Sequence, residues 1–112
     1  IVYTNPEVAG VGLTEAQAQQ QSIDYECRKL PMAYSGRFVA ENEGGEGICK
    51  VIADKATERV LGVHMLGNPC SEIIGSACIA IERGMTMSEL ERVVLPHPTV
   101  TEIIKECIET EA

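Results

Sequence analysis

The runs Ile48-Cys49-Lys50-Val51-Ile52-Ala53 and Val60-Leu61-Gly62-Val63-His64-Met65-Leu66 decide the fold of this 112-residue chain. Both runs are rich in β-branched and large aliphatic residues, which favour strands. Only the short polar segment Asp54 to Arg59 separates them. Two such runs joined by a short connection predict an antiparallel β-hairpin.

The residues before this hairpin alternate between extended and helical patterns. Tyr3 to Val11 is typical of extended chain, and Asp24 to Met32 predicts a strand. Thr14 and Gln17 have the spacing of a capping box, which predicts the start of a helix. Ser35 to Glu41 predicts a single helical turn.

The residues after the hairpin predict three helices. Asn68 is expected to cap the first, with Pro69 at its first position and Gly84 just past its end. Ser88 and Glu91 predict a capping box for a short second helix. The apolar stripes of the first and last helices are Ile73, Ile74, Ala77, Cys78 and Ile81, and Val100, Ile103, Ile104, Cys107 and Ile108. Strands followed by helices indicate an α+β fold, an antiparallel sheet covered by helices.

Charge and composition exclude several classes of function. The net charge is −8, from 17 acidic and 9 basic residues, so nucleic-acid backbones and anionic membrane surfaces would be repelled. No apolar run approaches the roughly 20 residues that cross a bilayer. We therefore expect neither a nucleic-acid nor a membrane partner.

The cysteines suggest neither a metal site nor a disulfide framework, because none forms a Cys-x-x-Cys pair and their number is odd. Free cysteines are among the most buried residues. We expect all five to be small buried hydrophobes in a reducing compartment: Cys27, Cys49, Cys70, Cys78 and Cys107.

The segment Pro96-His97-Pro98-Thr99-Val100-Thr101-Glu102 carries the strongest chemical signal. A histidine between two prolines loses most of its backbone freedom, since proline fixes its own φ and restricts the residue before it. Thr99-x-x-Glu102 predicts a capping box at the mouth of the last helix. A rigidly held imidazole with a carboxylate one turn away is suited to proton transfer.

Two alternatives stay open for this segment. His97 could be an ordinary loop histidine, and Glu102 could be a cap or an imidazole partner, but not fully both. The other histidine, His64, alternates with apolar neighbours in a strand and is expected to be packed rather than catalytic. The glycine-rich segment Gly44 to Gly47 lacks the spacing of a phosphate-binding loop. The proton carrier thus lacks a nucleophile, a metal or a cofactor motif of its own.

Four segments follow one another in a recognisable order. They are Tyr3 to Glu15, the paired strands Lys50 to Ile52 and Arg59 to Gly67, the helix Glu72 to Gly84, and His97-Pro98-Thr99-x-x-Glu102. Together they resemble the C-terminal dimerisation domain of the pyridine nucleotide-disulfide oxidoreductases, and within that family the dihydrolipoamide dehydrogenases most.

The resemblance implies that residues 1–112 are the C-terminal dimerisation domain of a longer homodimeric enzyme. FAD and NAD would bind to upstream domains that also carry a redox-active cysteine pair, and this chain alone is expected to bind neither. Lipoyl domains of 2-oxoacid dehydrogenase complexes would be the partners. The implied location is the cytoplasm, or the mitochondrial matrix in a eukaryote.

The same resemblance implies the roles of three residues. His97 would act as base and acid for the dithiol of the partner subunit, and Glu102 would orient the imidazole and stabilise its protonated form. The backbone of His97 and Pro98 would border the flavin, with a cis His97–Pro98 bond.

Two other functions stay open. Glutathione reductases share the histidine signature, whereas mercuric reductases usually end in a cysteine pair that the tail 108–112 lacks. Pro96 stands where lipoamide dehydrogenases often have alanine. The chain could also be a dimerisation module without chemistry of its own.

Overall fold

The computed structural model describes residues 1–110, and Glu111 and Ala112, the end of the tail without a cysteine pair, lie outside the described residues. A four-stranded antiparallel sheet has the order β1-β4-β3-β2. The strands are β1 (Val8–Gly12), β2 (Tyr25–Pro31), β3 (Ile48–Asp54) and β4 (Val60–Leu66). The predicted hairpin is therefore the β3–β4 pair at the centre of the sheet, and the predicted α+β class is confirmed.

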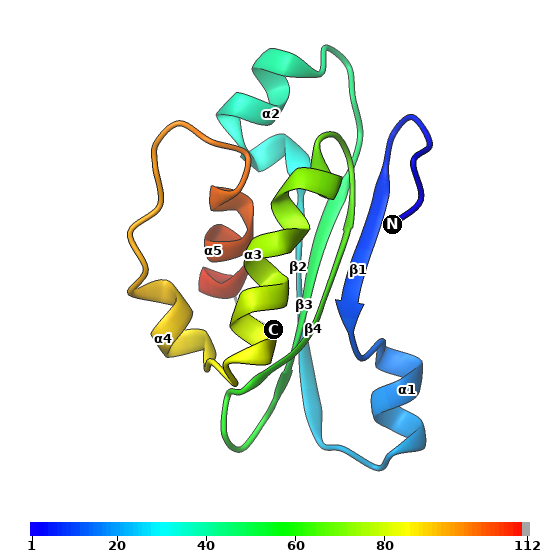
Figure 1. Cartoon of the computed structure of the whole chain (residues 1–112), viewed down its shortest axis with the longest axis vertical. Coiled ribbons are helices and arrows are strands. Elements are labelled where there is room, and N and C mark those ends of the chain that lie inside the picture. The colour runs from blue at the N-terminus through cyan, green and yellow to red at the C-terminus, as the bar shows by residue number, and fades with distance from the viewer. Residues whose placement is uncertain (111–112) are drawn as a thin grey trace.

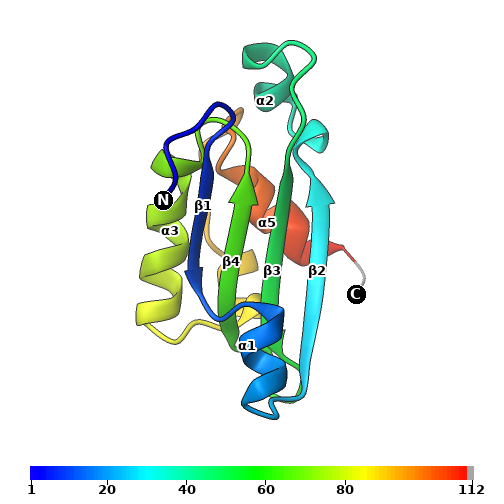
Figure 2. The same cartoon turned by 90° about the vertical axis from the view of Figure 1, so that its right-hand side faces the viewer.

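Helices cover one face of this sheet and only part of the other. They are α1 (Glu15–Gln20), α2 (Gly36–Glu41), α3 (Cys70–Glu82), α4 (Met87–Glu91) and α5 (Glu102–Glu109), with a 3₁₀ turn at Met32–Tyr34. Figure 1 shows α3 and α5 against the sheet, with α4 beside them. Figure 2 shows the opposite face, where α1 lies at one end. The loop between α4 and α5 thus lies on the helical side of the molecule.

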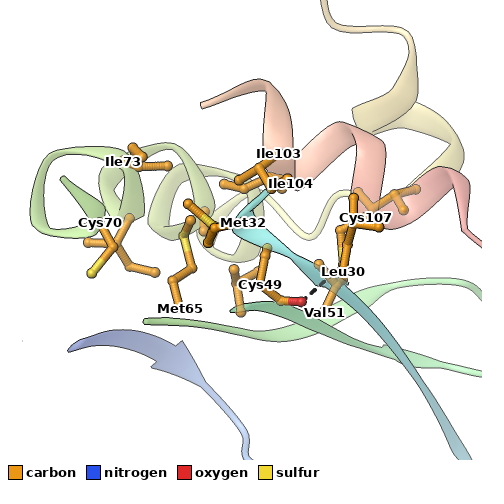
Figure 3. Packing of buried hydrophobic residues seen from close by; sticks show 14 of the residues in the cluster. Leu30, Met32, Cys49, Val51, Met65, Cys70, Ile73, Ile103, Ile104 and Cys107 are labelled. Atoms are coloured by element: carbon orange, nitrogen blue, oxygen red, sulfur yellow. Dashed lines mark hydrogen bonds between the residues drawn. The ribbon is translucent and has the colours of Figure 1, made fainter. Parts of the chain in front are cut away.

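The core lies between the sheet and α3 and α5 (Figure 3). Alternate residues of β3, namely Cys49, Val51 and Ala53, point into it, as the period of a strand requires. The predicted apolar stripe of α5 is buried in full, so that prediction is confirmed. Figure 3 also shows Cys107 of α5 above β3, where its thiol donates to the carbonyl of Cys49 at 3.4 Å.

The apolar face of α3 differs from the predicted one. Cys78 is exposed and Ile81 is only half-buried. The sheet covers a stripe rotated slightly round the helix, which consists of Cys70, Ile73, Ile74, Ala77 and Ala80. For the cysteines, the prediction of full burial is correct for Cys49, Cys70 and Cys107, and wrong for the half-buried Cys27 and the exposed Cys78.

The capping predictions are confirmed for α1 and wrong for α3 and α4. Asn68 does not cap α3, because its side-chain oxygen accepts the Glu7 amide N–H at 2.9 Å and Pro69 takes the N-cap position. The box of α4 is formed by Thr86 and Glu89. Ser88 instead lies within that helix. Gly84 does follow the end of α3, with the positive φ of +64° that favours glycine.

Thr86→Ala should lower the free energy of unfolding by about 1 kcal/mol, because the Thr86 hydroxyl accepts the Glu89 amide N–H at the start of α4. Ser88→Ala is the matched control, since its hydroxyl donates only to the exposed carboxylate of Glu58. Urea unfolding of both variants measures the difference. An equal or larger loss in Ser88→Ala would contradict the corrected cap.

Residues 1–110 contain neither a membrane-spanning helix nor a cluster of metal ligands. No helix is long and apolar enough to cross a membrane. Within the same range, no group of three or more histidine, cysteine, aspartate or glutamate side chains converges as metal ligands.

Candidate acid–base site on the α4–α5 loop

His97 and Glu102 form a direct pair at the start of α5. The imidazole Nδ1 lies 2.9 Å from Oε1 and 3.1 Å from Oε2 of the carboxylate. The side chain of His97 is 81% exposed, whereas that of Glu102 is 23% exposed. The structure therefore brings together the two residues singled out from the sequence, with the carboxylate against the protein and the imidazole outward.

Local hydrogen bonds shape the loop that presents His97. The Thr99 hydroxyl donates to the carbonyl of Pro96 at 2.8 Å, and the Thr99 amide N–H donates to Glu102 Oε1 at 2.9 Å. The His97–Pro98 peptide bond is cis, as the resemblance implied. These bonds close the chain into a compact turn, in which His97 stands at the outer edge.

The predicted capping box at α5 is only half formed. Glu102 accepts the Thr99 amide N–H, but the Thr99 hydroxyl turns back to Pro96 instead of accepting from the helix. The helix begins at Glu102, and Thr101 holds the N-cap position without a side-chain bond. The hydrogen bond to Pro96 takes up the hydroxyl that the box would need.

Glu102 accepts from the loop backbone and from the imidazole at once, while the capping box itself stays half formed. Its Oε1 lies 2.9 Å from the Thr99 nitrogen and 2.9 Å from His97 Nδ1. A carboxylate oxygen has two lone pairs and can accept two hydrogen bonds. The same oxygen thus ties the loop to the helix and orients the ring.

The electrostatics favour an ionised Glu102. The Thr99 amide N–H holds the pKa of Glu102 below its usual range, and the hydrogen bond and charge of His97 add to this. An ionised carboxylate can only accept, so Nδ1 of His97 must carry the proton in their hydrogen bond. In the neutral ring the lone pair is then on Nε2, and among residues 1–110 no hydrogen bond to Nε2 is found. This tautomer leaves Nε2 ready to accept a proton.

Two cations that the sequence did not single out contact the same loop. The Lys105 ammonium donates to the carbonyl of Val93 at 2.9 Å, and Arg37 of α2 donates to the carbonyl of Pro98 at 3.4 Å. Neither lies in a recognisable motif. Arg37 is 61 residues from Pro98 in sequence, so only the fold reveals the contact.

His64 is packed, as predicted. Its Nε2 lies 2.9 Å from the carbonyl oxygen of Leu13, and its ring covers Gly10, where a Cβ would come within 2.5 Å of Nδ1. The ring is on β4, next to β1, and has no part in the His97–Glu102 pair. The small residue at position 10 is thus required by the ring above it.

The glycine-rich loop 44–47 does not have the setting of a diphosphate-binding turn. A diphosphate is usually bound where a glycine-rich turn leads from a strand into a helix. The glycine-rich loop 44–47 instead runs from α2 into β3. His97 and Pro98 form an exposed loop edge.

Comparisons with known proteins agree with this structure. The family described as "Pyridine nucleotide-disulphide oxidoreductase, dimerisation domain" matches residues 1–108. The chain is 42% identical over 106 residues to a mitochondrial dihydrolipoyl dehydrogenase of Caenorhabditis elegans. The alignment covers 95% of this chain and 21% of that protein. It is 41% identical over 109 residues to a dihydrolipoyl dehydrogenase of Thermus scotoductus, in an alignment that covers 97% of this chain and 23% of that protein.

A solved structure shows the same fold. The HOCl-induced flavoprotein disulfide reductase RclA of Escherichia coli superposes with a TM-score of 0.85 and is 28% identical. The match covers 93% of this chain and 24% of that one. The chain therefore spans about a fifth to a quarter of the length of these proteins. With matching sequence over residues 1–108 and matching fold, it belongs to the dimerisation-domain family of the pyridine nucleotide-disulphide oxidoreductases.

Proposed function

We propose that residues 1–112 are the C-terminal interface domain of a dihydrolipoamide dehydrogenase-like enzyme, with His97 and Glu102 as an acid–base pair for a dithiol of the partner subunit. The observation that carries the proposal is the oriented imidazole on an exposed loop, with Nδ1 bound to Glu102 and no hydrogen bond to Nε2 from the described part of the chain. Relatives at about 40% identity are named dihydrolipoyl dehydrogenases, which supports a dithiol substrate. Lipoyl domains of 2-oxoacid dehydrogenase complexes are the proposed partners.

The chemistry asked of His97 is the transfer of one proton. A free thiol with a pKa near 8.5 is mostly protonated at neutral pH, yet only the thiolate attacks a disulfide. Nε2 of His97 accepts the thiol proton, and the thiolate sulfur then forms a bond to one disulfide sulfur while the other leaves as a thiolate. The imidazolium returns its proton to a thiolate in the reverse direction, and the charge of Glu102 stabilises it in between.

FAD and NAD(P) are properties of the full-length flavoprotein in this proposal. A solved relative is a flavoprotein disulfide reductase, and the glycine-rich loop 44–47 lacks the spacing of a phosphate-binding loop. The cofactors then bind to the remaining domains, and His97 and Pro98 approach the flavin only by their backbone. For location we propose the cytoplasm or the mitochondrial matrix, because relatives come from a bacterium and from mitochondria.

The apolar stripes predicted on α3 and α5 are not available to join two copies. Apart from Cys78 and Ile81, the structure buries those stripes against its own sheet. A hollow of about 200 Å³ remains open between α3, α4 and α5, and its walls are largely apolar. Ile79 beside it is 66% exposed, and Val94 on the adjoining loop is 92% exposed. We assign the dimer contact to this face, defined by Ile79, Leu90, Val93, Val94 and Leu95.

This assignment suits the proposed role of His97. Val94 and His97 are three residues apart on the same loop. Burying Val94 against a second copy therefore brings His97 to that copy, where the dithiol would be. A contact related by two-fold symmetry, the commonest closed assembly, gives each subunit a histidine from the other.

Glu102→Gln should slow the dithiol reaction of the full-length enzyme less than His97→Gln, which removes the imidazole. The amide oxygen can still accept from Nδ1, but it lacks the charge that stabilises the imidazolium. Stopped-flow measurement of the dithiol step compares the two variants. Glu109→Gln is the control, since its carboxylate lies on the same helix and makes no hydrogen bond to the loop. Unchanged dithiol kinetics in Glu102→Gln would limit Glu102 to holding the loop through the Thr99 amide.

The same variant should also change how stability depends on pH. Because the pKa of Glu102 is lower in the folded state than its ordinary value of 4.5, its contribution to stability is present above that value. This contribution is lost as the pH falls through the lowered pKa that Glu102 has in the folded state. The advantage of the wild type over Glu102→Gln in urea unfolding should therefore be present at pH 7 and shrink in acid below pH 4.5. An advantage that grew on acidification would contradict the assigned hydrogen bonds.

A further inference from the structure

The loop that carries His97 is tied to the rest of the protein by very few polar contacts. Within residues 1–110, Arg37 provides the only side-chain hydrogen bond from outside 93–105 to that segment, 3.4 Å from its Nη1 to the carbonyl oxygen of Pro98. The other side-chain bonds are local, such as those of Thr99 to Pro96 and of Lys105 to Val93. Long-range polar support for this loop therefore comes from α2.

The helix that carries Arg37 is itself well anchored. The buried Ser35 caps α2 by accepting the Phe38 amide N–H at 3.2 Å, and the Phe38 ring is buried in the core. At the other end, the Asn42 side chain donates to the carbonyl of Asn68 at 3.2 Å. Arg37 thus projects from a fixed element.

The guanidinium reaches the loop across open space. A hollow of about 220 Å³, lined in part by Pro69, Glu72 and Thr99, lies between α2, the start of α3 and the loop. Glu41, one turn along α2, accepts from the Arg37 Nε and so directs the guanidinium. Phe38 of α2 and Val100 at the end of the loop belong to the same core, and the guanidinium supplies the side-chain hydrogen bond between α2 and the loop.

The two ends of one peptide group are held by different partners. The carbonyl of the Pro98–Thr99 peptide accepts from Arg37, while its N–H donates to Glu102 Oε1. The same oxygen of Glu102 accepts from His97 Nδ1. A tilt of this peptide would therefore disturb the bond that orients the imidazole.

We propose that Arg37 is a positioning residue that orients His97 by holding the carbonyl side of the Pro98–Thr99 peptide. The proposal rests on the acid–base role proposed for His97. Arg37 acts through the backbone and Glu102 and does not itself transfer a proton. Its position on α2 makes the orientation of the imidazole dependent on a helix remote in sequence.

The 112-residue chain allows a structural test that does not depend on catalysis. In Arg37→Gln, the Thr99 amide hydrogen should exchange with solvent about threefold faster by NMR, because the peptide loses one of its two partners. In Arg37→Lys the exchange rate of the Thr99 amide should be closer to that of the wild type, since lysine keeps a cationic donor. Arg92→Gln controls for the lost charge, because Arg92 is next to the loop without a side-chain bond to it. Equal exchange in Arg37→Gln and wild type would overturn the proposal.

The full-length enzyme provides the functional test. Arg37→Gln should lower kcat of the dithiol step about fivefold and change its pH profile, with KM little changed, because a misoriented base acts on the transition state. Arg37→Lys should restore part of the rate. If His97→Gln slows this step and Arg37→Gln does not, the positioning role of Arg37 alone is wrong. If neither variant slows it, the proposed function is wrong as well.

Discussion

His97→Gln in the full-length enzyme is expected to slow electron exchange with the dithiol substrate by about 10²–10⁴-fold, the usual contribution of general acid–base catalysis. Reduction of the flavin by NADH should keep its rate, because only the dithiol step has to remove a proton from a thiol. Glutamine can still hydrogen-bond to Glu102 but cannot take up a proton near neutral pH. Stopped-flow absorbance of the flavin measures the two half-reactions separately.

His64→Gln is the matched control for this experiment. It replaces the other histidine, whose Nε2 lies 2.9 Å from the Leu13 carbonyl oxygen on the sheet. Both half-reactions should stay near the wild-type rate in that variant. Equal losses of both half-reactions in His97→Gln would mean a structural role near the flavin, and the catalytic assignment would be withdrawn. Full activity would favour a module that only joins subunits.

Val94→Asp combined with Ile79→Asp is expected to weaken self-association of the 112-residue chain by about 100-fold or more, because each dimer would bury four carboxylates in an apolar contact. Both side chains are exposed in the single chain, at 92% and 66%, so the substitutions remove no internal packing of comparable size. Sedimentation equilibrium over a range of concentrations measures the dissociation constant.

The control for the dimer variant is Val39→Asp, which adds one carboxylate at an exposed valine of α2, away from the proposed face. Its dissociation constant should stay close to that of the wild type. In the full-length enzyme, the Val94→Asp/Ile79→Asp variant should also lose the dithiol reaction, because His97 would no longer reach a partner. A variant that stays dimeric with normal activity would show that another face joins the subunits.

The sequence alone determined the features that depend on short spacings. The β3–β4 hairpin and the buried stripe of α5 follow from periods of two and of three to four residues, which neighbouring residues determine. The His97–Glu102 pair could also be expected, since both lie within one turn-and-helix segment. The four motifs, in their order along the chain, were sufficient to indicate the family from the sequence alone.

Tertiary structure decided the features that depend on residues far apart in the chain. The buried face of α3 is set by where the sheet lies beneath it, which left Cys78 exposed although its spacing fitted the stripe. Asn68 satisfies the Glu7 amide 61 residues away rather than capping the next helix.

The two uses of Glu102 and the contact of Arg37 have the same origin. A carboxylate oxygen accepts as many donors as the folded chain brings to it, and here the turn at Pro98 brings both Thr99 and His97. Arg37 reaches Pro98 only because α2 folds back onto the start of α3. Local patterns thus determine which residues can do chemistry, while packing between distant segments determines how they are held.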